Sequence, residues 1–322
     1  MINIKITMNK NYFDILRAGV NTTFQDRGRK NLYHIGIPFS GVMDYRNYLL
    51  ANGLVGNKNG DPVLEFAFQG PLLKFFGDKI NIAITGEVNF TIKKKGNLIK
   101  GNCYQSIVLD NGDELDILST KNSVYGYLAL GGEIDLKYQW SSCSINTKAN
   151  IGANEGKKLG TNQKINFLKI NKDLNSKKFN HINTRIEKIR VIKGTNFDYF
   201  SEEAKNIFFT KEFNISKLSD RMGTRLEGPK IENVVDTNIK SEGLVKGVIQ
   251  IPADGNPIIM LSDHGTIGGY PKIGVVISAD YDKLVQLSPG SKIKFQKVEL
   301  SDAETLFKLY EMETQNLISQ IK

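Results

Sequence analysis

The sequence predicts a mainly β protein with a few short helices. Between Val63 and Leu130, short apolar runs follow one another, separated by Gly, Asn, Asp or Pro. Many short strands with frequent turns are typical of an antiparallel sandwich or barrel. After residue 186 the runs RVIKG, GVIQI and PIIML continue this pattern. The strand-like runs of the first half are VLEFAF, LLKFF, INIAIT, VNFTI, IVL, ELDIL and VYGYLAL.

Length and composition predict two soluble domains. The chain has 322 residues, of which 40% are hydrophobic and 24% charged, as in ordinary globular proteins. The polar, unpatterned tract 171–184 is the best linker candidate, so we expect domains at 1–184 and 185–322. The first ten residues lack the apolar core of a signal peptide, and no apolar run approaches the roughly 20 residues of a membrane helix. We therefore expect a cytoplasmic protein that does not bind a membrane.

The basic charge does not predict a nucleic-acid partner. The formal net charge is +9, but the lysines are scattered and no aromatic residues interleave with them. The densest run, 93–95, precedes Gly96 and Asn97 and is typical of a hairpin tip. The three histidines and two cysteines have none of the spacings of metal sites, so we expect no metal.

Three segments have helical patterns. Asp44 precedes a run with Tyr45, Tyr48 and Leu49 on one face, which predicts a helix capped by Asp44. Ser201 with two following glutamates predicts a second helix to about Ile207. The residues at 301–304, Ser-Asp-Ala-Glu, form a capping-box pattern, and the apolar spacing up to 321 predicts a C-terminal helix.

Glu65 lies inside a predicted strand, and two interpretations are open. A carboxylate that faces the interior must be paired and is well placed for chemistry. Alternation along the strand instead turns Leu64, Phe66 and Phe68 inward and Glu65 toward solvent. The residues alone favour the second interpretation.

The stretch 241–274 combines two buried strands with a polar loop. Dense turn residues at 252–257 separate the runs GVIQI and PIIML. The loop that follows contains Asp263, His264, Thr266 and a Gly-Gly-Tyr-Pro sequence at 268–271. A rigid scaffold that presents such a loop is typical of a functional site, although the glycines alone could serve tight turns.

Taken together, these segments resemble the biotin-dependent carboxyltransferase family, also called allophanate hydrolase subunit 2. This family includes the C subunit of the bacterial 5-oxoprolinase, the Kip-type antagonist protein and part of urea carboxylase. The matching segments are TTFQDRGR (22–29), GIPFSGVMD (36–44), LANGLVGN (50–57), LEFAFQGPLLKF (64–75), YLALGGEID (127–135), SDRMGTRLEGP (219–229), GVIQIPADGNPIIMLSD (247–263), GGYPKIGVVISAD (268–280) and QLSPGSKIKF (286–295).

The resemblance implies two cyclophilin-like β-barrel domains and a subunit of an ATP-dependent 5-oxoprolinase, which hydrolyses 5-oxo-L-proline to L-glutamate. It implies partner subunits similar to allophanate hydrolase subunit 1 and to LamB/YcsF proteins. ATP is the expected cofactor, and a partner could bind it because this chain lacks a nucleotide motif. The alternatives are a carboxyltransferase component, for which biotin would be the cofactor, and a regulatory protein that antagonises a histidine-kinase inhibitor.

The resemblance also implies site residues. Asp44 and Asp263 are candidate general bases, and Arg221 or Arg225 would hold a carboxylate or phosphoryl group. The implied catalytic residues are Asp26, His34, Asp44 and Asp263, and the implied substrate-binding residues are Arg29, Ser40, Asn52, Glu65, Arg221, Arg225, Gln250, Asp254, Thr266, Gly269 and Tyr270.

Two departures from the family pattern predict altered anion binding. His264 and Lys157 each stand where the family usually has arginine, and neither offers the same bidentate contact. We further expect the carboxylates of Asp254 and Asp263 and the ring of Tyr270 to meet Asp26, His34 and Asp44 at a domain interface, where sites often lie.

Overall fold

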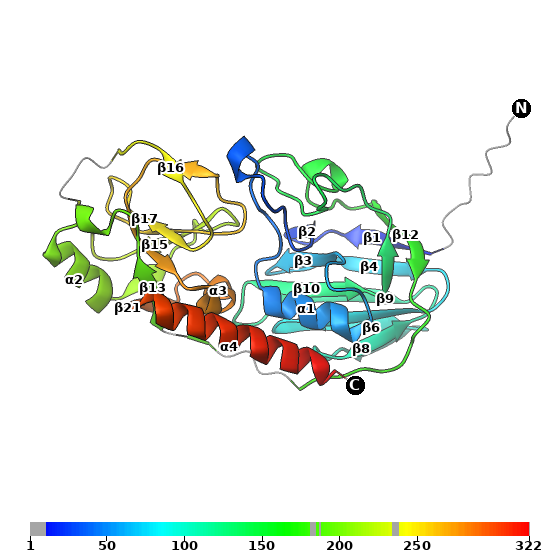
Figure 1. Cartoon of the computed structure of the whole chain (residues 1–322). Coiled ribbons are helices and arrows are strands. Elements are labelled where there is room, and N and C mark those ends of the chain that lie inside the picture. The colour runs from blue at the N-terminus through cyan, green and yellow to red at the C-terminus, as the bar shows by residue number, and fades with distance from the viewer. Residues whose placement is uncertain (1–10, 181–184, 187, 234–237, 322) are drawn as a thin grey trace, which may run out of the picture. The chain divides into compact units, whose positions relative to one another are not determined.

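A computed structural model describes residues 11–180, 185–186, 188–233 and 238–321 (Figure 1). The chain forms two compact units. Unit 1 comprises residues 1–27, 47–182 and 317–322, and unit 2 comprises residues 28–46 and 183–316. The segment 28–46 thus belongs with the C-terminal half of the chain, although it lies near the N-terminus of the sequence.

Unit 1 consists of two antiparallel sheets around one apolar core. The strand order is β11-β12-β1-β4-β9-β6-β7 in the larger sheet and β2-β3-β10-β5-β8 in the smaller one. Phe13, Phe75, Phe66 and Leu128 from the two sheets are buried in the shared core. The strands are β1 (Tyr12–Arg17), β2 (Asn21–Gln25), β3 (Val63–Ala67), β4 (Leu72–Phe76), β5 (Ile80–Thr85), β6 (Val88–Lys94), β7 (Asn97–Lys100), β8 (Ser106–Leu109), β9 (Glu114–Thr120), β10 (Tyr125–Leu130), β11 (Gly132–Ile134) and β12 (Lys164–Ile170).

The hairpin predicted at the lysine run is confirmed. Lys94 of β6 pairs with Asn97 of β7, so Lys95 and Gly96 form a two-residue turn. Their φ angles are 46° and 86°, as a type I′ turn requires. The lysine run therefore lies at a hairpin tip.

Unit 2 contains a closed barrel with the strand order β13-β20-β17-β18-β15-β14-β21. Its core includes Ile189, Ile249, Ile259 and Ile273 from four strands, together with a stack of Phe208 on Phe295 whose ring centroids are 4.3 Å apart. The prediction of a mainly β fold is confirmed, and the runs RVIKG, GVIQI and PIIML are barrel strands. The strands are β13 (Lys188–Lys193), β14 (Phe213–Ile215), β15 (Gly223–Glu227), β17 (Val248–Gln250), β18 (Ile258–Met260), β20 (Lys272–Val276) and β21 (Lys292–Lys297), with the separate pair β16 (Glu242–Gly243) and β19 (Ile267–Gly268).

Four α-helices complete the described chain: α1 (Tyr45–Leu54), α2 (Glu202–Thr210), α3 (Ser278–Val285) and α4 (Leu300–Ser319). Asp44 directly precedes α1, as expected. The Ser201 side chain accepts a hydrogen bond from the Ala204 N–H at 3.1 Å, which confirms the predicted cap of α2. The capping box predicted at Ser301 is wrong, because α4 begins at Leu300 and Ser301 lies within its first turn. Helix α3 follows a barrel strand directly and was not predicted.

Two further expectations are corrected. Glu65 is only 1% exposed, not turned to solvent, because β3 lies between β2 and β10 and is buried along its whole length. Phe68, expected to face inward, follows the end of β3 with a φ of 60° and is 45% exposed. The proposed linker is partly ordered, since Lys177 and Phe179 hydrogen-bond to the main chain of Ser106 and Tyr104; residues 181–184 lie outside the described part.

Among the residues described, no helix has both the length and the apolar character needed to cross a membrane.

Candidate functional site

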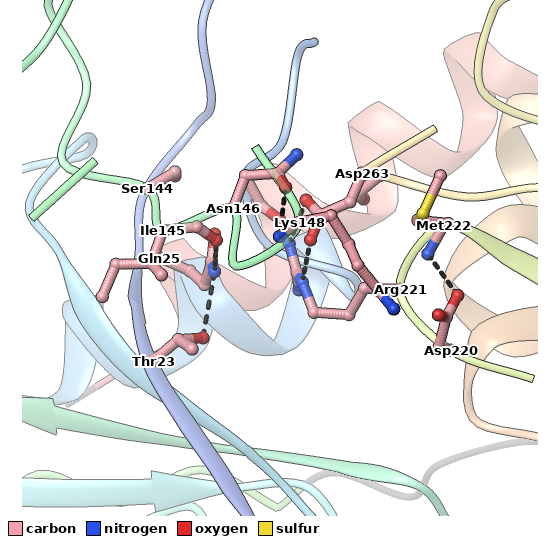
Figure 2. A network of polar contacts seen from close by, with 12 residues as sticks. Thr23, Gln25, Ser144, Ile145, Asn146, Lys148, Asp220, Arg221, Met222 and Asp263 are labelled. Atoms are coloured by element: carbon pink, nitrogen blue, oxygen red, sulfur yellow. Dashed lines mark hydrogen bonds and ion pairs between the residues drawn. The ribbon is translucent and has the colours of Figure 1, made fainter. Parts of the chain in front are cut away.

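An ion pair in unit 2 ties the segment 28–46 to the barrel. Arg221 Nε and Nη2 donate to the two carboxylate oxygens of Asp263 at 2.9 and 3.0 Å (Figure 2). Arg221 Nη2 also donates to the Gly41 carbonyl at 2.7 Å. Both side chains are almost fully buried. The planar guanidinium is therefore fixed in orientation, and it holds the main chain of the segment in place at Gly41.

The segment itself closes into a loop between residues 28 and 39. The Arg29 N–H donates to the Phe39 carbonyl at 2.8 Å. Gly28 has a φ of +80°, and a side-chain carbon there would lie 2.7 Å from the same carbonyl oxygen. Only glycine satisfies both conditions, which gives a physical reason for glycine at position 28. Ser40 and Gly41 follow with positive φ angles of 57° and 81°.

Carboxylates hold the end of the segment. Asp44 Oδ2 accepts a hydrogen bond from Gln286 Nε2 at 2.9 Å. Asp282 accepts from the main-chain N–H groups of Tyr45 and Arg46 at 3.1 and 3.0 Å, and it also accepts from the hydroxyl of Tyr310. Burial raises the pKa of Tyr310, so this hydroxyl stays protonated and donates.

His264 packs against the same segment. Its ring stacks on Tyr33 with centroids 5.8 Å apart, and Nε2 lies 3.3 Å from the Tyr33 hydroxyl. His264 Nδ1 lies 2.6 Å from the Gly265 carbonyl, which cannot donate, so Nδ1 carries the proton and Nε2 accepts from Tyr33. Burial lowers the pKa of His264. The imidazole is therefore neutral at pH 7 and can accept a proton.

Lys246 lies between aromatic rings. Its Nζ is 4.0 Å from the ring centroid of Tyr281 and 6.0 Å from that of Phe39. No hydrogen bond or ion pair joins this ammonium to another residue in the described part of the chain. Burial lowers the pKa of Lys246, and the charge of Arg221 lowers it further, whereas Asp282 raises it. The lysine stands in the wall of a pocket of about 480 Å³ that is otherwise mostly apolar.

In unit 1, the predicted residue Asp26 forms a separate buried cluster. Its carboxylate accepts from the hydroxyls of Ser142 and Ser144, each at 2.6 Å, and from the Cys143 N–H at 2.7 Å. Three donors fix the orientation of this carboxylate. Next to it, Gln25 Nε2 donates to Thr23 Oγ1 and to the Ile145 carbonyl (Figure 2).

The other predicted residues of unit 1 have buried, largely local contacts. Asn52 Nδ2 donates to the Asp61 carbonyl at 3.0 Å, and its amide oxygen accepts from Asn57 at 3.0 Å. Glu65 is enclosed between neighbouring strands, where Thr23 and Tyr127 are its pairing partners. These positions support the main chain around α1 and β3.

In unit 2 the predicted residues do not all converge. Gln250 Nε2 donates to the Tyr270 carbonyl at 3.2 Å, which holds the Gly-Gly-Tyr-Pro loop against β17. Asp254 instead accepts from the main chain and side chain of Asn256 in its own turn. The remaining predicted positions divide into buried ones, Arg29 and Ser40, and ones exposed or half-exposed, His34, Arg225, Thr266, Gly269 and Tyr270.

The expected meeting of six residues stays a prediction. Asp26 belongs to unit 1, whereas His34, Asp44, Asp254, Asp263 and Tyr270 belong to unit 2. Within the described residues, no group of three or more His, Cys, Asp or Glu side chains could hold a metal ion.

Sequence reasoning missed Tyr33, Lys246 and Asp282. Tyr33 is adjacent to the predicted His34, and Lys246 lies inside the stretch 241–274. Both residues therefore lie in or next to segments that the sequence analysis had selected. Their partners are 28 or more residues away in the chain, and no local pattern indicates such contacts.

The sequence matches the family described as carboxyltransferase domain, subdomain A and B, over residues 35–297. It is 31% identical to the 5-oxoprolinase C subunit of Escherichia coli over 90% of this chain and 92% of that protein. The C subunit of the Haemophilus influenzae enzyme is also 31% identical, over 91% and 93%. Among solved structures, the urea amidolyase of K. lactis gives a TM-score of 0.85 at 28% identity, covering 95% of this chain and 20% of that one. The chain therefore belongs to the carboxyltransferase domain family.

Proposed function

We propose that this protein is a subunit of an ATP-dependent 5-oxoprolinase, which opens 5-oxo-L-proline to L-glutamate. The observation that carries the proposal is the end-to-end match to two proteins that are each named as the C subunit of 5-oxoprolinase. Those matches span more than 90% of each relative, which supports a role as a subunit of that kind.

The chemistry explains why the reaction needs ATP and more than one subunit. A lactam carbonyl is a weak electrophile, and phosphoryl transfer to its oxygen creates a better leaving group. No phosphate-binding loop occurs in this sequence, so we assign ATP binding to a partner subunit. The partners would resemble allophanate hydrolase subunit 1 and LamB/YcsF proteins.

Unit 2 supplies the groups that this chain would contribute. Arg221 is already bonded to Asp263 and Gly41, so we assign it the positioning of residues 39–44. Arg225 is exposed and can meet an anionic substrate. Asp44, next to Gln286, and the neutral His264 are the groups suited to proton transfer.

The test is reconstitution of the complex. Together with its partner subunits, the protein should support ATP-dependent release of glutamate from 5-oxoproline, and alone it should be nearly inactive. Asp44→Asn should lower kcat while the complex still assembles, whereas the exposed Asp302→Asn makes the same charge change and should not. Robust glutamate release by the isolated chain would contradict the proposed division of labour.

A second function, carboxyl transfer from biotin, is favoured by one observation. The structural match to urea amidolyase covers 95% of this chain. This sequence has no Ala-Met-Lys-Met biotinyl motif, so a separate carrier would have to supply carboxybiotin. Transfer of a labelled carboxyl group from carboxybiotin to a small amide, with no glutamate formed from 5-oxoproline, would favour this function over the first.

A further inference from the structure

The pocket beside Lys246 has the properties of a small-molecule site. Its volume of about 480 Å³ falls within the usual range for ligand pockets, about 300–1,000 Å³. All of its lining residues belong to unit 2. They come from the segment 28–46, the ends of β13 and β20, residues 245–246 before β17, residues 277–278 at the start of α3, and the first turns of α4.

The walls of the pocket are apolar and accessible. Phe39 and Ile277 line it, as do Val245, Leu300 and Phe307. Leu300 is 60% exposed and Phe307 37% exposed, and both line this one pocket. Exposed apolar side chains gathered at one site are typical of a binding surface. A ligand with an apolar body would remove this surface from water, which favours binding.

Lys246 determines what charge the ligand should have. Its ammonium faces aromatic rings, and in the described chain it has no carboxylate partner within ion-pair distance. A partly buried cation with only π faces around it is incompletely compensated, and a carboxylate from a ligand would complete it. Asp282 contributes attraction only through space, because its oxygens are bonded to Tyr45, Arg46 and Tyr310.

The remaining polar residues in the pocket lining further restrict the chemical class of the ligand. They are Tyr33, Ser278 and Glu304. The Tyr33 hydroxyl is already within hydrogen-bond distance of His264 Nε2, and Glu304 is exposed in the first turns of α4. A phosphate or other dianion would need several donors, and Glu304 would repel its double charge more strongly than the single charge of a carboxylate. The single positive charge of Lys246 matches the single negative charge of one carboxylate.

We propose that this pocket binds a small monocarboxylate with an apolar body and that Lys246 is the residue that pairs with its carboxylate. The proposal does not depend on 5-oxoprolinase activity, because it rests on the pocket and the lysine alone.

The test uses the full chain with 4-methylpentanoate and its uncharged analogue 4-methylpentanamide, titrated by calorimetry. The carboxylate should bind saturably at one site, and the amide at least about tenfold more weakly, which corresponds to about 1.4 kcal/mol. Lys246→Met retains the apolar stem and should weaken carboxylate binding at least about tenfold, whereas Lys246→Arg should retain most of it. Lys93→Met makes the same charge change at the hairpin tip of unit 1 and should leave binding unchanged.

Two further measurements locate the site. Ala303→Phe fills the pocket from α4 and should abolish binding, so the proposal stays testable if Lys246→Met fails to fold. Saturating 4-methylpentanoate should slow acetylation of Lys246, followed by peptide mass spectrometry, without slowing that of Lys93. Equal affinity for acid and amide, unchanged binding in Lys246→Met, or no saturable binding by the wild-type chain would each overturn the proposal.

Discussion

Arg221 and Asp263 form a buried bidentate ion pair, and the same guanidinium binds the main chain of Gly41. Gly41 is separated from Arg221 by 180 residues, so this contact attaches an early segment to the late barrel. Hydrogen bonds from Ser262 to the Val42 carbonyl and from Gln286 to Asp44 add to the attachment. The ion pair therefore explains why residues 28–46 belong to unit 2.

Breaking this pair should be costly. Arg221→Met leaves the Asp263 carboxylate buried without this partner, and Asp263→Asn removes the negative charge that balances the guanidinium. Removing one member of a buried pair costs about 3–5 kcal/mol. Urea unfolding followed by circular dichroism should show this loss, whereas Glu202→Gln, which breaks the exposed pair with Lys205, should change little. Equal stability of Arg221→Met and wild type would show that Arg221 does not stabilise the attachment of residues 28–46 to the barrel.

Asp26 should act mainly through stability. Its carboxylate accepts hydrogen bonds from Ser142, Ser144 and Cys143 in the interior of unit 1. Asp26→Asn replaces one acceptor oxygen by a donor that faces those donors, and each lost bond to a charged group costs about 1.5–3 kcal/mol. The expected result is a lower urea midpoint, with Asp302→Asn as the exposed control. A catalytic defect without any loss of stability would assign Asp26 to chemistry instead.

His264 should make stability depend on pH. Burial lowers its pKa in the folded state, so the unfolded chain takes up the proton first as the pH falls below about 6.5. The stability present above that pH is lost as the pH falls toward the lowered pKa. The charged groups around the ring act in opposite directions, since Asp263 raises this pKa and Lys246 lowers it.

The measurement is the free energy of unfolding between about pH 5 and 7.5, compared for wild type, His264→Gln and His34→Gln. The His264 variant should lose less stability on acidification than the wild type, whereas His34→Gln removes an exposed imidazole and should retain the wild-type slope. Parallel curves for wild type and His264→Gln would show that the buried ring does not titrate as described.

Asp282 should stabilise the start of α1. Its carboxylate accepts the N–H groups of Tyr45 and Arg46, which have no partners within the helix. Asp282→Ala should cost more than about 1 kcal/mol, the usual value for loss of a capping side chain, because it also removes the acceptor of the Tyr310 hydroxyl. Glu311→Gln, which removes an exposed charge on α4, is the matched control in the same thermal unfolding assay. An unchanged melting temperature in Asp282→Ala would contradict the capping role.

Local chemistry made the strands predictable. Turn residues bracket the apolar runs, and Lys95-Gly96 has the φ angles that its turn demands. Two local predictions failed. Alternation could not show that Glu65 lies on a strand covered on both faces, because burial depends on neighbouring strands. Ser301 matched a capping pattern, but the helix begins one residue earlier.

The candidate site was predictable in part. Asp263 and Arg221 were identified as functional candidates from the family resemblance, and the structure joins them. Their contact with Gly41, the stack of His264 on Tyr33 and the aromatic surroundings of Lys246 depend on tertiary structure, because they join residues far apart in the chain. No periodicity or motif encodes such contacts.

The most direct test of the proposed function compares the reconstituted complex with and without this chain. With 5-oxoproline and ATP, we expect glutamate and ADP to form only when the chain is present, at a rate proportional to the amount added until the complex is saturated. Glutamate formation at the same rate without the chain, or none with every subunit present, would contradict the proposal.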